Sequence, residues 1–237
     1  MSDESTVEQL LRQILKQLQT TRNIPSTALA LRREAVRDGV EHIRGDRRFD
    51  HARVMLHNAE ALQAALAEVP AWDGVIAEFG VYRGTSLTMI AKRFPDVTVH
   101  GFDSFTGLPE AWAGPGKGKS AGFFDVGGTP PELPVDNVKF HVGWFDQSVP
   151  MFAAHTLEPF RFAHLDADLY SSTKIVFELL GDRFIPGTVV VFDEYFGYHG
   201  WQLHEHKAFE EFLAASDLTF EALAIGHMNL AVRLLAR

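Results

Sequence analysis

The chain contains no cysteine among its 237 residues. Disulfide bonds, thiolate metal ligands and cysteine nucleophiles are therefore excluded together. A chain without disulfides is typical of the cytoplasm, which is the expected location. The first residues also lack the basic and apolar pattern of a secretory signal, and no later apolar run is long enough to cross a bilayer. We therefore expect a soluble protein that has no membrane partner.

Positive charge is scarce as well, because 22 Lys and Arg residues face 31 Asp and Glu residues and the formal net charge is −9. The basic residues are spread along the chain rather than gathered in a block. Binding to nucleic acid requires clustered Lys and Arg, so no nucleic-acid partner is expected and a small-molecule substrate fits better. Hydrophobic residues make up 46% of the chain, which is enough for the core of one domain.

The spacing of apolar residues changes after Gly74. Before it, apolar residues recur at helical spacing in residues 7–18 and 50–68, which predicts an N-terminal helical extension over residues 1–70. After it, short apolar runs are typical of parallel strands buried on both faces, with helices as crossovers between several of them. The expected strands span residues 75–79, 97–102, 138–142, 160–165 and 188–192, and the expected helices span residues 85–93, 171–180 and 203–215.

The last two apolar runs, residues 220–225 and 229–235, are separated only by Gly226-His227-Met228. That connection is too short for a helical crossover, so the two runs should form an antiparallel hairpin. For residues 71–237 the sequence predicts an α/β fold with a doubly wound, mostly parallel seven-stranded sheet, preceded by N-terminal helices.

Two further segments have open interpretations. Residues 109–134 are rich in Gly and Pro and longer than most ordered loops, so they form either an active-site lid, which we favour, or a disordered surface insertion. The apolar stripe of residues 7–18 packs either on its own domain or on a second copy of the chain. The second alternative leads us to expect a homodimer or a higher homo-oligomer.

A glycine-containing turn follows the first expected strand and leads directly into a helix that begins at Thr85-Ser86. Glycine allows a ligand to approach the backbone, and the amides at a helix start donate to anionic groups. The spacing Gly80-x-x-x-Gly84 lacks the third glycine of dinucleotide sites, which disfavours a nicotinamide cofactor. Asp103 ends the second strand, where a carboxylate accepts hydrogen bonds from a ribose. A nucleoside without a pyrophosphate therefore fits, although these glycines could serve only a tight turn and Asp103 could cap a loop.

Four acids follow the fourth and fifth strands: Asp166 and Asp168, then Asp193 and Glu194. The carboxyl ends of parallel strands meet at one edge of a sheet, so these side chains should converge. Crowded carboxylates repel one another, which indicates a divalent cation, and oxygen ligands favour Mg²⁺, with Mn²⁺ or Ca²⁺ as alternatives. Helix capping is the competing interpretation, and it accounts well for Asp168 alone.

A zinc site is conceivable too, because three histidines, His199, His204 and His206, lie close by in the sequence. It ranks below magnesium, since His204 and His206 would not share a face of the expected helix. Trp144, after the third strand, could flank an adenine or belong to the core.

Taken together, these motifs resemble those of the macrocin- and mycinamicin-type sugar O-methyltransferases, and of the related aminocoumarin sugar O-methyltransferase. The resemblance runs from about residue 78 to residue 208. It rests on five motifs in the same order, at residues 78–84, 103–109, 143–145, 165–173 and 193–195.

The resemblance implies a class I methyltransferase, a Rossmann-like sheet that binds S-adenosylmethionine. It implies that Mg²⁺ is held by Asp166, Asp193 and Glu194 and that Asp168 acts as the general base. The expected cofactor-binding residues are Glu78, Gly80, Tyr82, Gly84, Thr85, Ser86, Asp103, Ser104, Gly143, Trp144 and Asp166. The chain departs from the family at Ala167, where Gly is usual, and at Glu194, where Asp is usual.

The resemblance thus implies methyl transfer from S-adenosylmethionine to a hydroxyl of a small molecule, a sugar or a glycosylated natural product. A catechol or another phenolic diol is the alternative acceptor, because chelation of a cation needs only adjacent oxygens. A noncatalytic nucleotide-binding protein is the alternative from a different class.

Overall fold

A computed structural model describes residues 11–13, 26–116 and 118–237. Of the helix expected over residues 7–18, only residues 11–13 are described, and these are helical. The rest of that helix lies outside the described residues, so the packing of its apolar stripe stays a prediction. Within the described ranges, no helix combines the length and the apolarity that crossing a bilayer requires.

A single sheet runs through the centre of the fold. Its strands are β1 (Arg53–Val54), β2 (Val75–Phe79), β3 (Val99–Asp103), β4 (Val138–Val142), β5 (Phe160–Leu165), β6 (Phe184–Phe192), β7 (Leu218–Ile225) and β8 (Leu230–Ala236). They lie in the order β1-β7-β8-β6-β5-β2-β3-β4. Only β8 is antiparallel to its neighbours, β6 and β7. The expected fold class, a class I methyltransferase sheet with a C-terminal hairpin, is confirmed.

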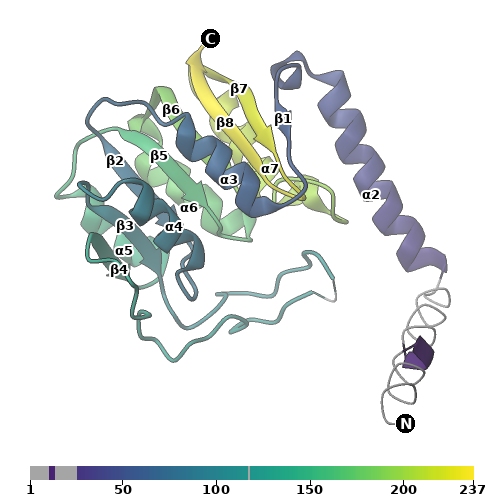
Figure 1. The fold of residues 1–237 in the computed structure, drawn as a ribbon, viewed down its shortest axis with the longest axis horizontal. Coiled ribbons are helices and arrows are strands. Elements are labelled where there is room, and N and C mark those ends of the chain that lie inside the picture. The colour runs from purple at the N-terminus through teal and green to yellow at the C-terminus, as the bar shows by residue number, and fades with distance from the viewer. Residues whose placement is uncertain (1–10, 14–25, 117) are drawn as a thin grey trace, which may run out of the picture.

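Helices cover both faces of the sheet (Figure 1). They are α2 (Ser26–Gly45), α3 (Asn58–Ala67), α4 (Thr85–Arg93), α5 (Phe145–Ala153), α6 (Tyr170–Leu180) and α7 (Glu205–Ala214), together with short 3-10 turns such as η1 (Arg47–Phe49). α3 and α4 pack on one face, whereas α5, α6 and α7 pack on the other. The central strands are buried on both faces, as expected: along β6, Val190 and Phe192 join one core cluster while Val189 and Val191 join the other.

The prediction of a helix over residues 50–68 is wrong for its first part, because the helix observed there, α3, begins only at Asn58. The preceding residues form β1, which lies parallel to β7, and the Met55 amide donates to the Ile225 carbonyl at 2.7 Å. Glu60 then accepts from the amides of Leu56 and His57, which fixes the start of α3. β1 is thus an eighth strand, added to the seven expected, and it is too short to leave a sequence pattern.

α2 is a helix that the sequence pattern did not reveal. Most of its surface is exposed, including Val36 at 53%, so its apolar residues form no clear stripe toward the core. Ala35 and Gly39 are the buried exceptions. In Figure 1 the N-terminal half of α2 projects away from the sheet.

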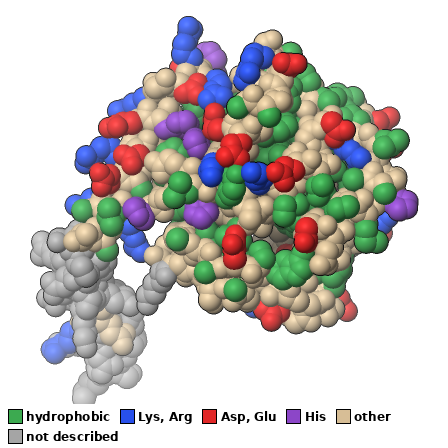
Figure 2. All heavy atoms as spheres, turned by 180° about the vertical axis from the view of Figure 1, so that it is seen from behind, with side chains coloured by type: hydrophobic (Ala, Val, Ile, Leu, Met, Phe, Trp, Pro, Cys, Tyr) green, Lys and Arg blue, Asp and Glu red, His purple; other side chains and the backbone are tan. Residues whose placement is uncertain are grey.

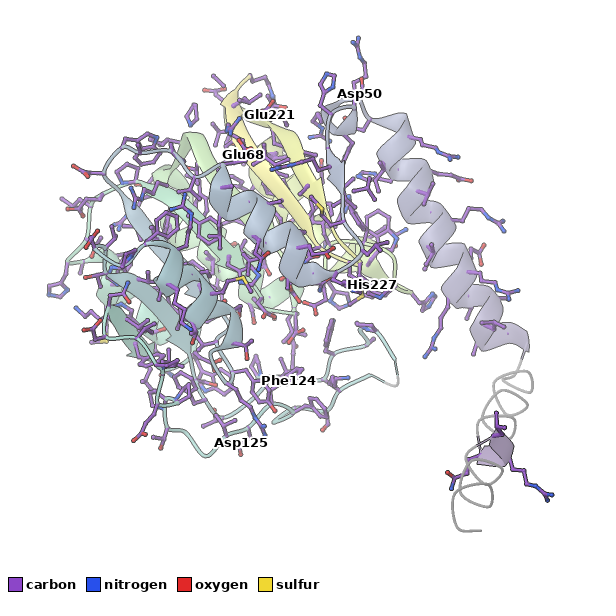
Figure 3. The ribbon with its side chains drawn as sticks, viewed as in Figure 1. Asp50, Glu68, Phe124, Asp125, Glu221 and His227 are labelled. Atoms are coloured by element: carbon purple, nitrogen blue, oxygen red, sulfur yellow. The ribbon has the colours of Figure 1, made fainter. Side chains whose placement is uncertain are left out.

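α3 precedes the domain boundary expected at residue 70, yet it packs directly on the sheet. Its buried residues Leu62 and Leu66 share a core cluster with strand residues such as Val191. Arg233 of β8 adds a polar link, donating to Glu68 at 2.9 Å and to Glu221 of β7 at 2.7 Å. Figure 3 shows Glu68 and Glu221 near each other at this end of the sheet.

Strand order reverses at β2, which lies between β5 and β3. In doubly wound sheets, ligands bind beyond the carboxyl ends of the strands at this point. The expected functional residues follow β2, β3, β4, β5 and β6, so the topology brings these segments to one edge. The surface in Figure 2 shows Lys and Arg side chains interspersed with Asp and Glu.

Candidate active site

A cavity of about 700 Å³ lies at the carboxyl ends of these strands. One part is lined by the glycine turn and the ends of β3 and β4, and it contains six of the expected cofactor-binding residues: Gly80, Tyr82, Asp103, Ser104, Gly143 and Trp144. The other part contains the four expected acids, Asp166, Asp168, Asp193 and Glu194. The volume is within the range of small-molecule sites. The two halves form one continuous space.

Asp103 ties the glycine turn to the end of β3. Its Oδ2 accepts from the amides of Val81 and Tyr82 at 2.8 and 2.7 Å, and its Oδ1 accepts from Phe105 at 2.7 Å. Tyr82 has a left-handed backbone with φ of 51°, which a side chain rarely adopts without such support. The expected ribose ligand is therefore also the residue that shapes the turn. Each carboxylate oxygen can accept more than one hydrogen bond, so capacity for a ribose remains.

The two glycines of the turn have different roles. A Cβ on Gly80 would lie 1.7 Å from the carbonyl oxygen of Asp166, so only glycine lets these two segments meet at the cavity. A Cβ on Gly84 would instead meet the Leu133 side chain at 2.5 Å. Gly84 therefore serves packing under the β3–β4 loop, and it lies outside the cavity lining.

Glu78, expected to contact the cofactor, is fully buried and lines neither this cavity nor the smaller one described next. It is paired with His164 of β5, whose Nδ1 lies 2.8 Å from Glu78 Oε1. His164 Nε2 lies 3.7 Å from Asp193 Oδ1 on the other side. Burial opposes a charge on the ring, but the facing Asp193 and Glu78 carboxylates raise the pKa of His164 well above its usual value. Glu78 thus acts on the acidic cluster through His164.

A second cavity, of about 220 Å³, lies between α3 and α4. Thr85 and Ser86, at the N-terminus of α4, line it together with Asp166 and Asp193. Asn58, the first residue of α3, lines it as well, and its Nδ2 donates to Asp193 Oδ2 at 3.4 Å. The sequence pattern did not reveal Asn58. One helix was expected over residues 50–68, and a residue in its middle gave no sign of a site.

The acids form two overlapping groups rather than one. Ligand atoms of Asp166, Asp168 and Glu194 lie within 4.8 Å of one another, and so do those of Asp166, Asp193 and His164. Asp166 belongs to both groups. Among the described residues, neither group includes His199, His204 or His206, which were considered for zinc.

The pKa directions follow from this crowding. Burial and the charges of neighbouring carboxylates raise the pKa values of Asp166 and Glu194 well above their usual range. Burial and the charge of Asp193 raise the pKa of Asp168 to about 7. Burial opposes ionisation of Asp193 too, but the facing His164 and the hydrogen bonds from Asn229 and Asn58 lower its pKa. The cluster thus holds more negative charge than its own surroundings neutralise.

The donor set fits a divalent cation. Glu194 Oε2 is buried and has no hydrogen-bond partner in the structure, so an electron-pair donor is free there. Closely grouped carboxylate oxygens are the hard ligands that Mg²⁺ prefers.

We expect the protein without metal to lose stability as the pH rises from about 4 to about 8. The Asp168 carboxyl has a pKa of about 7 in the fold against an ordinary 3.8, so the folded state binds more protons than the unfolded state in this window. The stability that the protonated Asp168 carboxyl contributes is fully present below its ordinary pKa, and it is lost as the pH rises through its pKa in the folded state. Asp166 and Glu194 shift in the same direction. Asp193 has a lowered pKa, so its contribution to stability rises with pH, and it does so only below the ordinary pKa of an aspartate.

Thermal unfolding in a chelator at several pH values measures this effect. The melting temperature should fall across the window, and added Mg²⁺ should restore it most at the alkaline end. A melting temperature that stays constant with pH in the chelator would contradict the crowding of these carboxyls.

The loop between β3 and β4 covers part of the cavity. Residues 107–110 and Phe124 of this loop line it, and Phe124 is labelled in Figure 3. Trp112 is buried and packs with Leu108 and with Leu169, which precedes α6. Ser171 of α6 also donates to Glu110 of the loop at 2.6 Å. These contacts hold the described part of the loop against α6, as a lid requires.

Comparison with known proteins identifies the family of the domain. The methyltransferase domain family matches residues 77–195. A relative from Streptomyces olivaceus, the 8-demethyl-8-(2,3-dimethoxy-alpha-L-rhamnosyl)-tetracenomycin-C 4'-O-methyltransferase, is 31% identical over 61% of this chain and 62% of its own length. The chain thus matches less than two thirds of that relative.

The solved structures that share the fold include two natural-product methyltransferases. The calicheamicin methyltransferase CalS11 has a TM-score of 0.57 at 23% identity, with 98% of this chain and 93% of that chain covered. The O-methyltransferase NovP has a TM-score of 0.55 at 22% identity, with 75% and 77% covered.

Proposed function

The chain belongs to the methyltransferase domain family, and from this we propose that it methylates a sugar hydroxyl of a natural product, using S-adenosylmethionine and a divalent cation. The observation that carries the proposal is the continuity of the cavity. The glycine turn with Asp103 and the four acids line the same space, so a methyl donor and a chelated hydroxyl can meet there. The relative from Streptomyces olivaceus, a rhamnosyl O-methyltransferase, supports a sugar as the acceptor.

S-adenosylmethionine supplies a methyl group on a positively charged sulfur. We assign its nucleoside to the part of the cavity formed by Asp103, Ser104 and Trp144, where a carboxylate, a hydroxyl and an aromatic ring lie together. We assign its amino-acid end to the second cavity. The N-terminal amides of α4, at Thr85 and Ser86, suit a carboxylate, and Asp166 and Asp193 suit an ammonium group.

We assign the cation to Asp166, Asp193 and Glu194, although Asp193 and Glu194 belong to different groups and only Asp166 is common to both. A bound divalent cation lowers the pKa of a coordinated hydroxyl and holds a diol in a fixed orientation. Asn229 and Asn58 donate to the two oxygens of Asp193 and so orient it, whereas Glu194 Oε2 is free to turn toward a ligand.

Asp168 is the proposed general base. Its pKa of about 7 suits proton transfer near neutral pH. The hydroxyl proton moves to the Asp168 carboxylate, the oxygen forms a bond to the methyl carbon, the carbon–sulfur bond breaks, and S-adenosylhomocysteine leaves. The surrounding residues contribute by alignment and by exclusion of water under the lid.

The charge of the cavity favours a neutral acceptor. Seven carboxylates line it, and its lining among the described residues includes neither Lys nor Arg: the acids are Asp103, Glu110, Asp146, Asp166, Asp168, Asp193 and Glu194. A nucleoside diphosphate sugar would bring negative charge to this surface. A sugar already attached to an uncharged aglycone fits better. Lys119 of the lid lowers the pKa of Asp168 by its charge but is not part of the lining.

A methyl-transfer assay over three classes of acceptor tests the proposal. We expect turnover of neutral glycosides that carry adjacent hydroxyls, and stimulation of this turnover by Mg²⁺. Nucleoside diphosphate sugars should be turned over more weakly. Turnover of catechols alone would support the second candidate, which Trp144 and Phe145 in the lining also accommodate. Cofactor binding in calorimetry, with no methyl transfer to any acceptor under any metal condition, would refute the enzymatic proposal.

A further inference from the structure

Glu205 is a fully buried carboxylate at the first position of α7, beside the acidic cluster. Its Oε1 accepts a hydrogen bond from the Ala167 amide at 3.2 Å. Its Oε2 accepts one from the Glu194 amide at 3.1 Å. One side chain therefore joins the loop that follows β5 to the loop that follows β6.

We propose that Glu205 is a positioning residue that sets the distance between these two loops and so shapes the cation site. The inference rests on the proposed function, because the site it shapes is the cation site assigned above. Each bonded amide lies next to the carboxylates concerned. Ala167 separates Asp166 from Asp168, and Glu194 is itself an assigned ligand.

The backbone of the first loop needs such support. Asp168 has φ of 60°, in the left-handed region, which residues other than glycine adopt only rarely. The bond from the Ala167 amide to Glu205 fixes the peptide between Asp166 and Ala167, one residue before the left-handed Asp168. Glu205 thus acts on the proposed base through the backbone rather than by touching a substrate.

Helix capping does not explain the side chain. A carboxylate in the first turn of a helix usually faces the free amides of its own helix. Both oxygens of Glu205 instead accept from loops outside α7. Burial of a carboxylate is costly unless its hydrogen bonds are made, so these two bonds are what holds it there.

Amide hydrogen exchange of the wild-type protein provides the first test, and it needs neither metal nor activity. The Ala167 and Glu194 amides should be protected in the metal-free protein. Exchange at the rate of free loop amides at both positions would overturn the inference, whatever the enzymatic activity is.

The second test is Glu205→Gln, which keeps the shape but puts an NH₂ group against one of the two amides. Glu210→Gln on the same helix, which removes the carboxylate charge from the ion pair with Arg48 at 3.4 Å, is the matched control. We expect faster exchange at Ala167 or Glu194, and a roughly 10- to 100-fold weaker affinity for Mn²⁺ used as a probe. Cofactor affinity and the control should stay at the wild-type level.

Wild-type affinity for Mn²⁺ in folded Glu205→Gln would refute the positioning role. If the wild type itself binds no Mn²⁺, the proposed cation site fails instead. The protection of the two wild-type amides then still decides whether Glu205 joins the loops.

Discussion

Replacing Asp168 with Asn is expected to lower kcat by roughly 10²- to 10⁴-fold, the usual contribution of a general base. The amide of Asn has nearly the shape of the carboxylate but does not take up the hydroxyl proton. Asn also tolerates the left-handed backbone that residue 168 adopts, with φ of 60°, so the loop should keep its conformation. The loss should therefore appear in kcat, with cofactor affinity unchanged.

Single-turnover rates and calorimetry with the cofactor measure these two quantities separately. Asp182→Asn, an exposed change on the 3-10 turn Gly181–Arg183, is the control for a general loss of one carboxylate. Turnover of Asp168→Asn at the wild-type rate would show that another group takes the proton. The variant should also flatten the fall in stability with pH, because it removes the carboxyl whose pKa lies near 7.

The sheet was predictable because its strands carry a strong local signal. The second half of β6 is a continuous apolar run, and β2 and β5 are mostly apolar, interrupted only by Glu78 and by Arg161 and His164. The strands β7 and β8 are separated by a turn too short for a helix. α2 and β1 were not predictable on the same grounds. α2 is mostly exposed, so it has little apolar patterning, and β1 exists only through its pairing with β7.

The residues of the candidate site also differ in how far local sequence patterns predict their positions. That the four acids and Asp103 line one cavity was predictable, because each follows the end of a strand and strand ends converge in any parallel sheet. Glu78 and Gly84 were expected to face a ligand; in the structure Glu78 pairs with His164, and a Cβ on Gly84 would meet Leu133. Such pairings between distant segments depend on how the layers pack, which local spacing does not encode. Asn58 and Glu205 are further examples, since each reaches the acidic cluster from a helix that packs against the sheet.

Removing divalent cations is expected to reduce turnover by roughly 10²- to 10³-fold, since Lewis-acid stabilisation contributes several kcal/mol. The residues themselves give the reason. Burial and the neighbouring carboxylates raise the pKa values of Asp166 and Glu194, so without a cation their ionised forms, which would bind and orient an acceptor through the metal, are disfavoured. The measurement is methyl transfer after treatment with a chelator, followed by addition of Mg²⁺, Mn²⁺ or Ca²⁺ in excess.

The matching variant is Glu194→Gln, which leaves the size of the side chain unchanged and removes its charge. Because Glu194 Oε2 has no hydrogen-bond partner to lose, the fold should tolerate the change. The metal concentration that gives the half-maximal rate should rise at least about 10-fold. Glu221→Gln, on the hairpin and paired with Arg233, is the control. Full activity in the chelator would remove the cation from the mechanism. Asp168 would then act on the hydroxyl alone, as a base whose pKa of about 7 is set by burial and by Asp193.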